Sequence, residues 1–183
     1  VDAVEARETM SSRLTTARQS VWSAIDNWAG LTGVFRKKFR FESSNTADAP
    51  EAAHRPDAPT SHSDLPAIAI MPGAVTPQWA TNLQADHPYT LVIRYWTAGR
   101  HVDKSEEIWD QIIQAVHRAK PEGNLDIDTY VKEGTGYAVP AGYGPSRMSF
   151  VKLGKADAQQ FDATLHEFTL VLRMKINPRT GTL

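Results

Sequence analysis

The residues of this sequence that could bind a metal ion or transfer a proton do not form a recognisable motif. Its six histidines include no pair at the i, i+4 spacing that aims two imidazoles at one ion from a helix. His101 and Asp103 could chelate a cation, but Asp103 with Glu106 three residues later is typical of a helix-capping pair. Asp126 and Asp128 would share one face of a strand, and two carboxylates are too few for a cation site. We therefore expect no metal ion.

Motifs for nucleophilic catalysis and for phosphate binding are also missing from the sequence. The chain has no cysteine, which excludes a thiolate nucleophile, and it has no Gly-x-Ser-x-Gly or Gly-x-x-x-x-Gly-Lys-Ser/Thr segment. Gly134–Tyr137 opens like a dinucleotide-binding loop, but Val139 and Pro140 follow where a third glycine and a helix are needed. The residues thus predict no catalytic residue, no cofactor and no enzymatic activity.

A basic cluster and two tryptophans are the candidate contact residues. Arg36, Lys38 and Arg40 alternate along an expected strand, where they would form a cationic stripe facing phosphates or an acidic neighbouring subunit. A solvated strand face is the simpler alternative. Trp79 falls in an expected loop and Trp96 near an expected strand end, and aromatic residues often anchor interfaces. We take these five side chains as candidate subunit-facing or DNA-facing contacts.

Two amphipathic helices are expected to position much of the core. The first spans residues 5–29, with apolar residues at steps of three and four, and Gly30 is expected to end it in a left-handed conformation. The second begins at Asp103. Its apolar stripe consists of Ile108, Trp109, Ile112, Ile113 and Val116.

Alternating or β-branched segments predict the strands of one sheet. In the first of them, Phe35, Phe39 and Phe41 are expected to share the face opposite the basic stripe. The expected strands span residues 34–41, 65–71, 89–96, 148–153 and 165–176.

Two segments differ from the rest in composition. Residues 43–64 contain no Leu, Ile, Val, Met or aromatic residue, which predicts a long exposed loop, and residues 121–145 read as a glycine- and proline-rich connector. The 183 residues and the balanced net charge of −1 indicate a single domain without a global field for nucleic acid. The expected fold class is α+β, a mostly antiparallel sheet with both amphipathic helices packed on one face and long exposed loops.

The order of these elements resembles the tail terminator and minor tail proteins of long-tailed bacteriophages. In that family a leader helix, a proline-marked strand, a long strand, a helix and a hairpin form one small domain. Here the helix ends near Trp28, Leu65–Ile70 matches the proline-marked strand, and Leu91–Trp96 matches the long central strand. The helix around Glu107–Ile113 and the strand pair within Ser149–Ile176 complete the order. The likeness covers most of the chain.

The resemblance implies a virion structural protein that acts without catalytic residues. Members form a hexameric ring at the head-proximal end of the tail tube, where the ring stops tube polymerisation and joins the head connector. The implied partners are further copies of the chain, the tail tube protein and the head–tail connector proteins. Genomic DNA would pass through the lumen without sequence-specific contact, and the virion would assemble in the host cytoplasm. We expect neighbour contacts in residues 43–64 and 121–145.

Three alternatives remain open from the sequence alone. A head-completion or connector-adaptor protein of the same neck would need the same kind of ring-forming domain. A small-molecule-binding or hydrolytic domain could be built around His101, Asp103 and His166. A nucleic-acid-binding module could use the basic cluster between Arg36 and Arg40, and its binding would depend strongly on salt.

Overall fold

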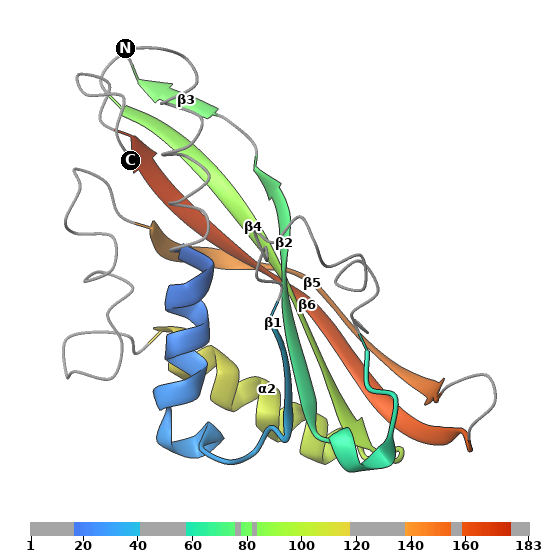
Figure 1. Cartoon of the computed structure of the whole chain (residues 1–183). Helices are drawn as coiled ribbons and strands as arrows, with labels where there is room; N and C mark the ends of the chain where they lie inside the picture. The colour runs from blue at the N-terminus through green and yellow to red at the C-terminus, as the bar shows by residue number, and fades with distance from the viewer. Residues whose placement is uncertain are drawn as a thin grey trace, which may run out of the picture.

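Two helices lie on one face of a single mixed β-sheet in the described part of the chain (Figure 1). The computed structural model describes residues 17–40, 58–75, 78–81, 84–117, 138–154 and 159–176. A helix over residues 17–27 comes first. It is followed by η1 (Ala29–Leu31), β1 (Lys37–Arg40), η3 (His62–Asp64), β2 (Ala67–Val75), β3 (Gln78–Thr81), β4 (Gln84–Ala98), α2 (Val102–His117), β5 (Ala138–Leu153) and β6 (Phe161–Ile176). The expected α+β class is confirmed.

The sheet is mostly antiparallel, as expected. Its strands lie side by side in the order β1-β2-β4-β6-β5, and the short β3 pairs with the beginning of β4. β1 runs parallel to β2, whereas every other pairing between the described strands is antiparallel. The pairing of β4 with β6 is continuous from Ala85 opposite Ile176 to Ala98 opposite Ala163. These two strands therefore form the centre of the sheet.

The larger core lies between the sheet and the two helices. Every second residue of β4 and β6 points to the helices, because successive side chains of a strand alternate between its faces. Leu91 lies opposite Leu170 and Ile93 opposite Phe168, and all four side chains are buried. Burial of a side chain of this size stabilises the fold by about 1.5–3 kcal/mol. The helices contribute Val21, Ile25, Ile108, Ile112 and Val116 to the same core.

A smaller apolar cluster lies on the opposite face of the sheet. Its buried members are Phe39, Leu65, Ala67, Ala69, Trp96 and Ala163. Trp96 is only 3% exposed, and its ring meets the Phe39 ring edge-on at a centroid distance of 6.1 Å. This burial corrects the expectation that Trp96 is a surface contact residue. The reason is that the even-numbered positions at this end of β4 face the second cluster instead of solvent.

Alternation along the sequence predicts that Phe35 and Phe39 share one face of the sheet, but the structure places them on opposite faces. β1 begins only at Lys37, so Phe35 precedes it and packs into the larger core. Phe39 lies within the strand and points to the smaller cluster. Lys38 consequently points to the helices, where its Nζ lies 2.5 Å from Asp26 Oδ1. The period of two holds within the hydrogen-bonded strand and not before it.

The first helix does not end at a left-handed Gly30. That residue lies inside η1, and the positive φ angle in this turn, 71°, belongs to Gly33. A Cβ atom on Gly30 would overlap the side chain of Gln111 in α2, whose Oε1 accepts a hydrogen bond from Trp28 Nε1 at 2.8 Å. Glycine at this position therefore leaves room for the Gln111 side chain where it accepts this hydrogen bond.

The second helix begins one residue earlier than the sequence predicts. α2 starts at Val102, so Asp103 lies within its first turn and does not cap it. An acidic residue there still interacts favourably with the positive end of the helix dipole. Among the helices in the described ranges, none is long and apolar enough to cross a membrane.

Part of the expected connector at residues 121–145 is a strand. β5 begins at Ala138 and continues past the connector, with register shifts before Gly142 and between Tyr143 and Ser146. β5 is an edge strand of the described sheet, and an edge with bulges tolerates the prolines and glycines that a central strand excludes. Its composition resembles a loop because the bulged edge accepts loop residues.

Several expected features fall outside the described residues. These are the helix before residue 17, Phe41, loop residues 43–57 and connector residues 121–137 with their two aspartates. The described end of the first loop contains η3, at which the Asp64 carboxylate accepts the Ser61 backbone N–H at 3.2 Å. Leu65 follows directly and is buried in the smaller cluster, so this end of the loop packs on the sheet.

Replacing Trp96 by alanine tests the assignment of this residue to the core. The variant Trp96→Ala should lower the free energy of unfolding by about 3–5 kcal/mol, because it leaves a cavity beside Phe39. Phe150→Ala, at an aromatic position that is 50% exposed, is the matched control and should cost less than about 1 kcal/mol. Urea unfolding of both variants and of the wild-type protein measures these free energies. Equal losses in the two variants would contradict the assignment.

Candidate functional site

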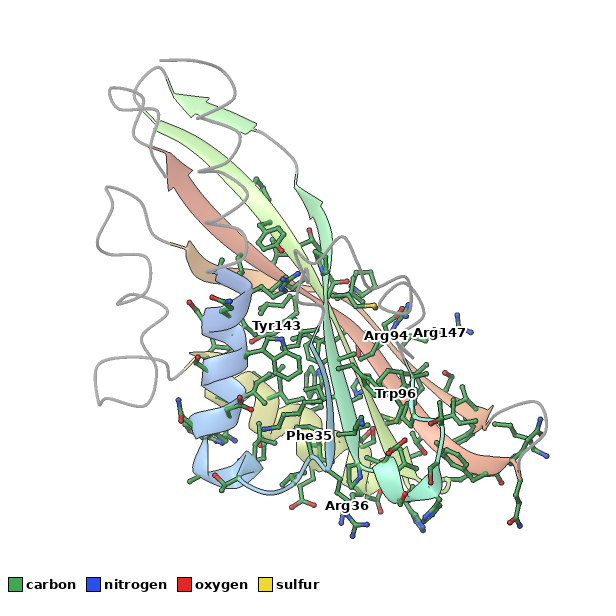
Figure 2. The ribbon with its side chains drawn as sticks, in the orientation of Figure 1. Phe35, Arg36, Arg94, Trp96, Tyr143 and Arg147 are labelled. Carbon is green, nitrogen blue, oxygen red and sulfur yellow. The ribbon has the colours of Figure 1, made fainter. Side chains whose placement is uncertain are left out.

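The three basic candidate residues do not form one surface stripe. Arg36 is exposed and precedes β1, and its backbone N–H donates to the Pro66 carbonyl at 2.8 Å. Lys38 points to the first helix, with which it forms an ion pair. Arg40 continues β1, and Trp79 lies in β3 instead of an expected loop; the side chains of both are outside the described part. Figure 2 shows Arg36 at an outer end of the molecule, apart from Trp96.

A row of charged side chains crosses the face of the sheet that points away from the helices. Glu167 of β6 lies opposite Arg94 of β4 on one side and opposite Arg147 of β5 on the other. The Arg94 guanidinium forms an ion pair with Glu167, and its Nη1 lies 3.8 Å from the sulfur of Met71. Arg147 is exposed at the edge of the sheet, and both arginines are labelled in Figure 2. No spacing along the sequence predicts this row, because it arises from the register of three strands.

A chain of polar groups lies on the helix side of the sheet, where β4, β6, β5 and α2 meet. Tyr95 and His166 lie opposite each other on paired strands and belong to the buried layer. Tyr95 Oη lies 2.6 Å from His166 Nδ1, and Ser146 Oγ lies 2.5 Å from His166 Nε2. Tyr95 Oη also donates to the backbone carbonyl of Ser105. The groups thus form one hydrogen-bonded chain that ends at Ser146, which is exposed.

The direction of every proton in this chain follows from the Ser105 carbonyl, which can only accept. Tyr95 therefore uses its single hydroxyl proton on that carbonyl, and its oxygen must accept from His166 Nδ1. His166 is then the Nδ1–H tautomer, which leaves a lone pair on Nε2. Ser146 accordingly donates its hydroxyl proton to Nε2. Ser105 Oγ, at 3.4 Å, donates a longer second bond to the Tyr95 oxygen.

The surroundings keep this chain uncharged. Burial lowers the pKa of His166, whose side chain is only 4% exposed, because the imidazolium loses its hydration. Burial is also the main cause of the raised pKa of Tyr95. Trp109 of α2 stacks on the imidazole with a centroid distance of 6.1 Å, and the Phe168 ring lies 5.8 Å away. At neutral pH the imidazole is therefore a neutral hydrogen-bond acceptor at Nε2.

A bulge in the edge strand brings Ser146 to this chain. Tyr143 lies opposite Leu170 and Ser146 opposite Phe168, with a register shift between the two pairs. The extra residue means that an odd-numbered and an even-numbered side chain both face the helices, which strict alternation forbids. Without the bulge, Ser146 would point to the opposite face.

Three buried side-chain atoms lack a hydrogen-bond partner within the described structure. They are Thr97 Oγ1, Trp109 Nε1 and Tyr143 Oη. The Tyr143 ring packs against His117 of α2 at 5.3 Å and against Phe168 at 6.3 Å, so it lies at the seam between α2 and β5, and burial raises its pKa to about 12. An unsatisfied buried polar group costs about 1–3 kcal/mol.

The histidine–aspartate set considered from the sequence is not assembled. His101 and Asp103 are exposed at the start of α2, whereas His166 is buried and bonds to other residues. No group of three metal-binding side chains occurs among the residues that the structure describes. The structure instead brings together a hydroxyl, an imidazole and a phenol, although no such combination was expected. Ser146 lies between the expected connector, which ends at residue 145, and the expected strand, which begins at residue 148, so no expected element places its side chain.

Sequence comparison with known proteins gives no relative from which a function could be transferred. No protein-family model matches the chain. No curated protein matches it in sequence either. Function is therefore inferred below from the order of the elements and from the geometry of the described residues.

The buried neutral state of His166 predicts a loss of stability in mild acid. The unfolded chain binds a proton at His166 near pH 6.5, and the folded chain does so only at lower pH, because its pKa is lowered. The stability that the fold gains from a neutral His166 is fully present above about pH 6.5, and it is lost as the pH falls through the pKa of His166 in the folded chain. Urea unfolding between about pH 7.5 and pH 5 should show the decrease.

The control for this prediction is a histidine outside the core. His166→Gln should remove the decrease in this pH range, whereas His101→Gln, at an exposed position, should keep it. An unchanged slope in His166→Gln would exclude His166 as the group responsible.

Proposed function

We propose that this protein is a structural component of the neck or tail of a long-tailed bacteriophage. Copies form a hexameric ring that ends the tail tube and joins it to the head connector. The observation that carries this proposal is the order of the elements: a helix, β1 and β2, the long β4, α2 and the β5–β6 hairpin. Both helices cover the same face of the sheet (Figure 1). This order agrees with that of the family that the sequence resembles.

The geometry of the sheet suits a ring subunit. A ring requires two different surfaces on each copy, one of which fits the other surface on the next copy. Within the described sheet β1 and β5 are the edges, and the helices cover one face. The edge of β5 carries bulges and the exposed charges Arg147 and Lys152, features that oppose unselective strand pairing. We therefore assign the contact between copies to side chains.

The charged row on the open face is the surface that we assign to this contact. Arg94 and Glu167 neutralise each other, with side chains 34% and 38% exposed, whereas Arg147 is exposed at the edge. The exposed side of α2 carries several acidic residues, namely Asp103, Glu106, Glu107 and Asp110. α2 also exposes Lys104, but the acids outnumber it, so the exposed side of α2 in one copy and the Arg147 edge of the open face in the next carry opposite net charges. Complementary charges of this kind set orientation and register at an interface.

The remaining partners follow from the position of such a ring. It would contact the tail tube protein on one side and the head–tail connector proteins on the other, and genomic DNA would pass through its lumen. None of these contacts requires a cofactor or a catalytic residue. The protein would assemble in the host cytoplasm and remain in the virion.

Imaging of the assembled particle tests the proposal directly. Electron cryomicroscopy of particles that carry a tagged copy of the full chain should show a sixfold ring at the head-proximal end of the tail tube. A ring next to the portal would instead assign the protein to the connector. Absence of the chain from every purified particle would refute a structural role in the virion.

Reversal of one charge tests the surface between copies. Arg147→Glu should reduce the number of tagged copies per particle at least tenfold, because it places an acid where the acidic side of α2 is expected to dock. Lys152→Glu is the matched control, since it reverses an exposed charge on the same strand but on the helix side. Quantitative mass spectrometry of purified particles measures both. Equal incorporation of the two variants would contradict this assignment.

A further inference from the structure

The proposed structural role makes no use of the chain of hydrogen bonds that ends at Ser146. A serine hydroxyl is a weak nucleophile until a neighbouring base removes its proton. Here the Ser146 hydroxyl donates a hydrogen bond to the neutral Nε2 of His166, with 2.5 Å between Oγ and Nε2. The hydroxyl belongs to an exposed residue, whereas the imidazole is buried. An electrophile in solution can therefore reach the serine while its base stays in the protein interior.

A third group holds the base in the required tautomer. Tyr95 accepts from His166 Nδ1 at 2.6 Å and is itself held by the Ser105 carbonyl. A nucleophile, a base and a group that orients the base are the three parts that nucleophilic catalysis by serine needs. Tyr95 does not reach the reacting atoms, so its role is that of a positioning residue.

Two buried donors on the helix side of the sheet are a second, independent observation. Trp109 stacks on the His166 ring, and its Nε1–H has no partner in the described structure; the same holds for Tyr143 Oη. Tyr143 and Ser146 face the same side of β5 because of the bulge between them. Buried donors without an acceptor are exceptional in folded proteins. Both donors therefore have hydrogen-bonding capacity that no described residue uses.

We propose that Ser146 is a nucleophilic serine that accepts an acyl group from small activated esters. Ser146 Oγ forms a bond to the ester carbonyl carbon while its proton moves to His166 Nε2. The bond from that carbon to the alcohol oxygen then breaks, and the leaving alcohol takes the proton from Nε2. Water attacks the acyl-serine next, again through Nε2. The acid leaves, and the hydroxyl proton returns to Ser146. This activity is independent of the proposed ring.

The test uses the folded full chain and a fluorophosphonate probe. Ser146 Oγ bonds to phosphorus, fluoride leaves, and the proton passes to His166. Intact mass should show one adduct, and peptide mapping should place it at Ser146. Ser146→Ala should abolish the adduct. Ser149→Ala, at the neighbouring serine on the same strand, faces the other side of the sheet and should be labelled at the wild-type rate.

Two further measurements separate reactivity from folding. His166→Gln should slow labelling by roughly 10²- to 10⁴-fold, the usual contribution of a general base. Nitrogen NMR of the wild-type protein should show the Nδ1–H tautomer for His166, a result that needs no variant to fold. In Tyr95→Phe the tautomer preference should be lost and labelling slowed, with the circular dichroism spectrum unchanged.

Three results would overturn the proposal that Ser146 is a nucleophile. The proposal fails if the folded wild-type protein forms no adduct, or if Ser146→Ala is labelled as fast as wild type. It also fails if His166 is the Nε2–H tautomer, because Nε2 could then accept no proton from Ser146. Esterase assays with p-nitrophenyl acetate report turnover, and a burst of one p-nitrophenol per chain is the expected result.

Discussion

The uninterrupted antiparallel pairing of β4 with β6 is the constraint on which the rest of the structure depends. It runs from Ala85 opposite Ile176 to Ala98 opposite Ala163, so the face of every side chain on both strands is set at once. A slip by one residue would exchange the two faces and expose Leu91. The same register places His166 opposite Tyr95 on the helix side.

The two faces of the sheet are therefore different in kind. The helix side buries large aliphatic and aromatic residues under the first helix and α2. Trp28, which follows the first helix, donates a hydrogen bond to Gln111 of α2 and so links the two helices. The opposite side has a small apolar cluster around Trp96 and, beyond it, the charged row through Glu167. A subunit with one closed face and one charged face can make directional contacts with its neighbours. This asymmetry is the physical basis for the proposed ring.

One bulge in the edge strand β5 affects both the pairing of the strand and the direction of two polar side chains. The bulge between Tyr143 and Ser146 disrupts the ladder locally, which an edge tolerates because only one neighbour is affected. Because of this bulge, Tyr143 and Ser146 both face the helix side of the sheet, where Ser146 contacts the His166 imidazole. Hydrogen bonds in such a low-dielectric layer polarise one another, and groups left without a partner are costly there. Both situations occur on the helix side of the sheet, in the hydrogen-bonded chain that ends at Ser146 and at the unpaired Trp109 Nε1 and Tyr143 Oη.

Local patterns in the sequence were enough to determine the fold class. Apolar residues at helical spacing predicted α2, and alternation predicted the central strands, because both periods reflect burial of one side of a regular element. The mostly antiparallel sheet with both helices on one face followed from the need to bury these stripes. The extent of β5 did not follow, since its prolines and glycines resemble a loop unless the edge position and the bulges are known.

The arrangement of the polar side chains was decided by tertiary structure alone. Tyr95, His166 and Ser146 come from three strands, and no spacing along the chain announces their contact. The same is true of Trp96, whose exposure depends on Phe39 and on the segment that covers the second face. Periodicity says which residues of one element share a face. Only the register between elements decides which side chains meet across it.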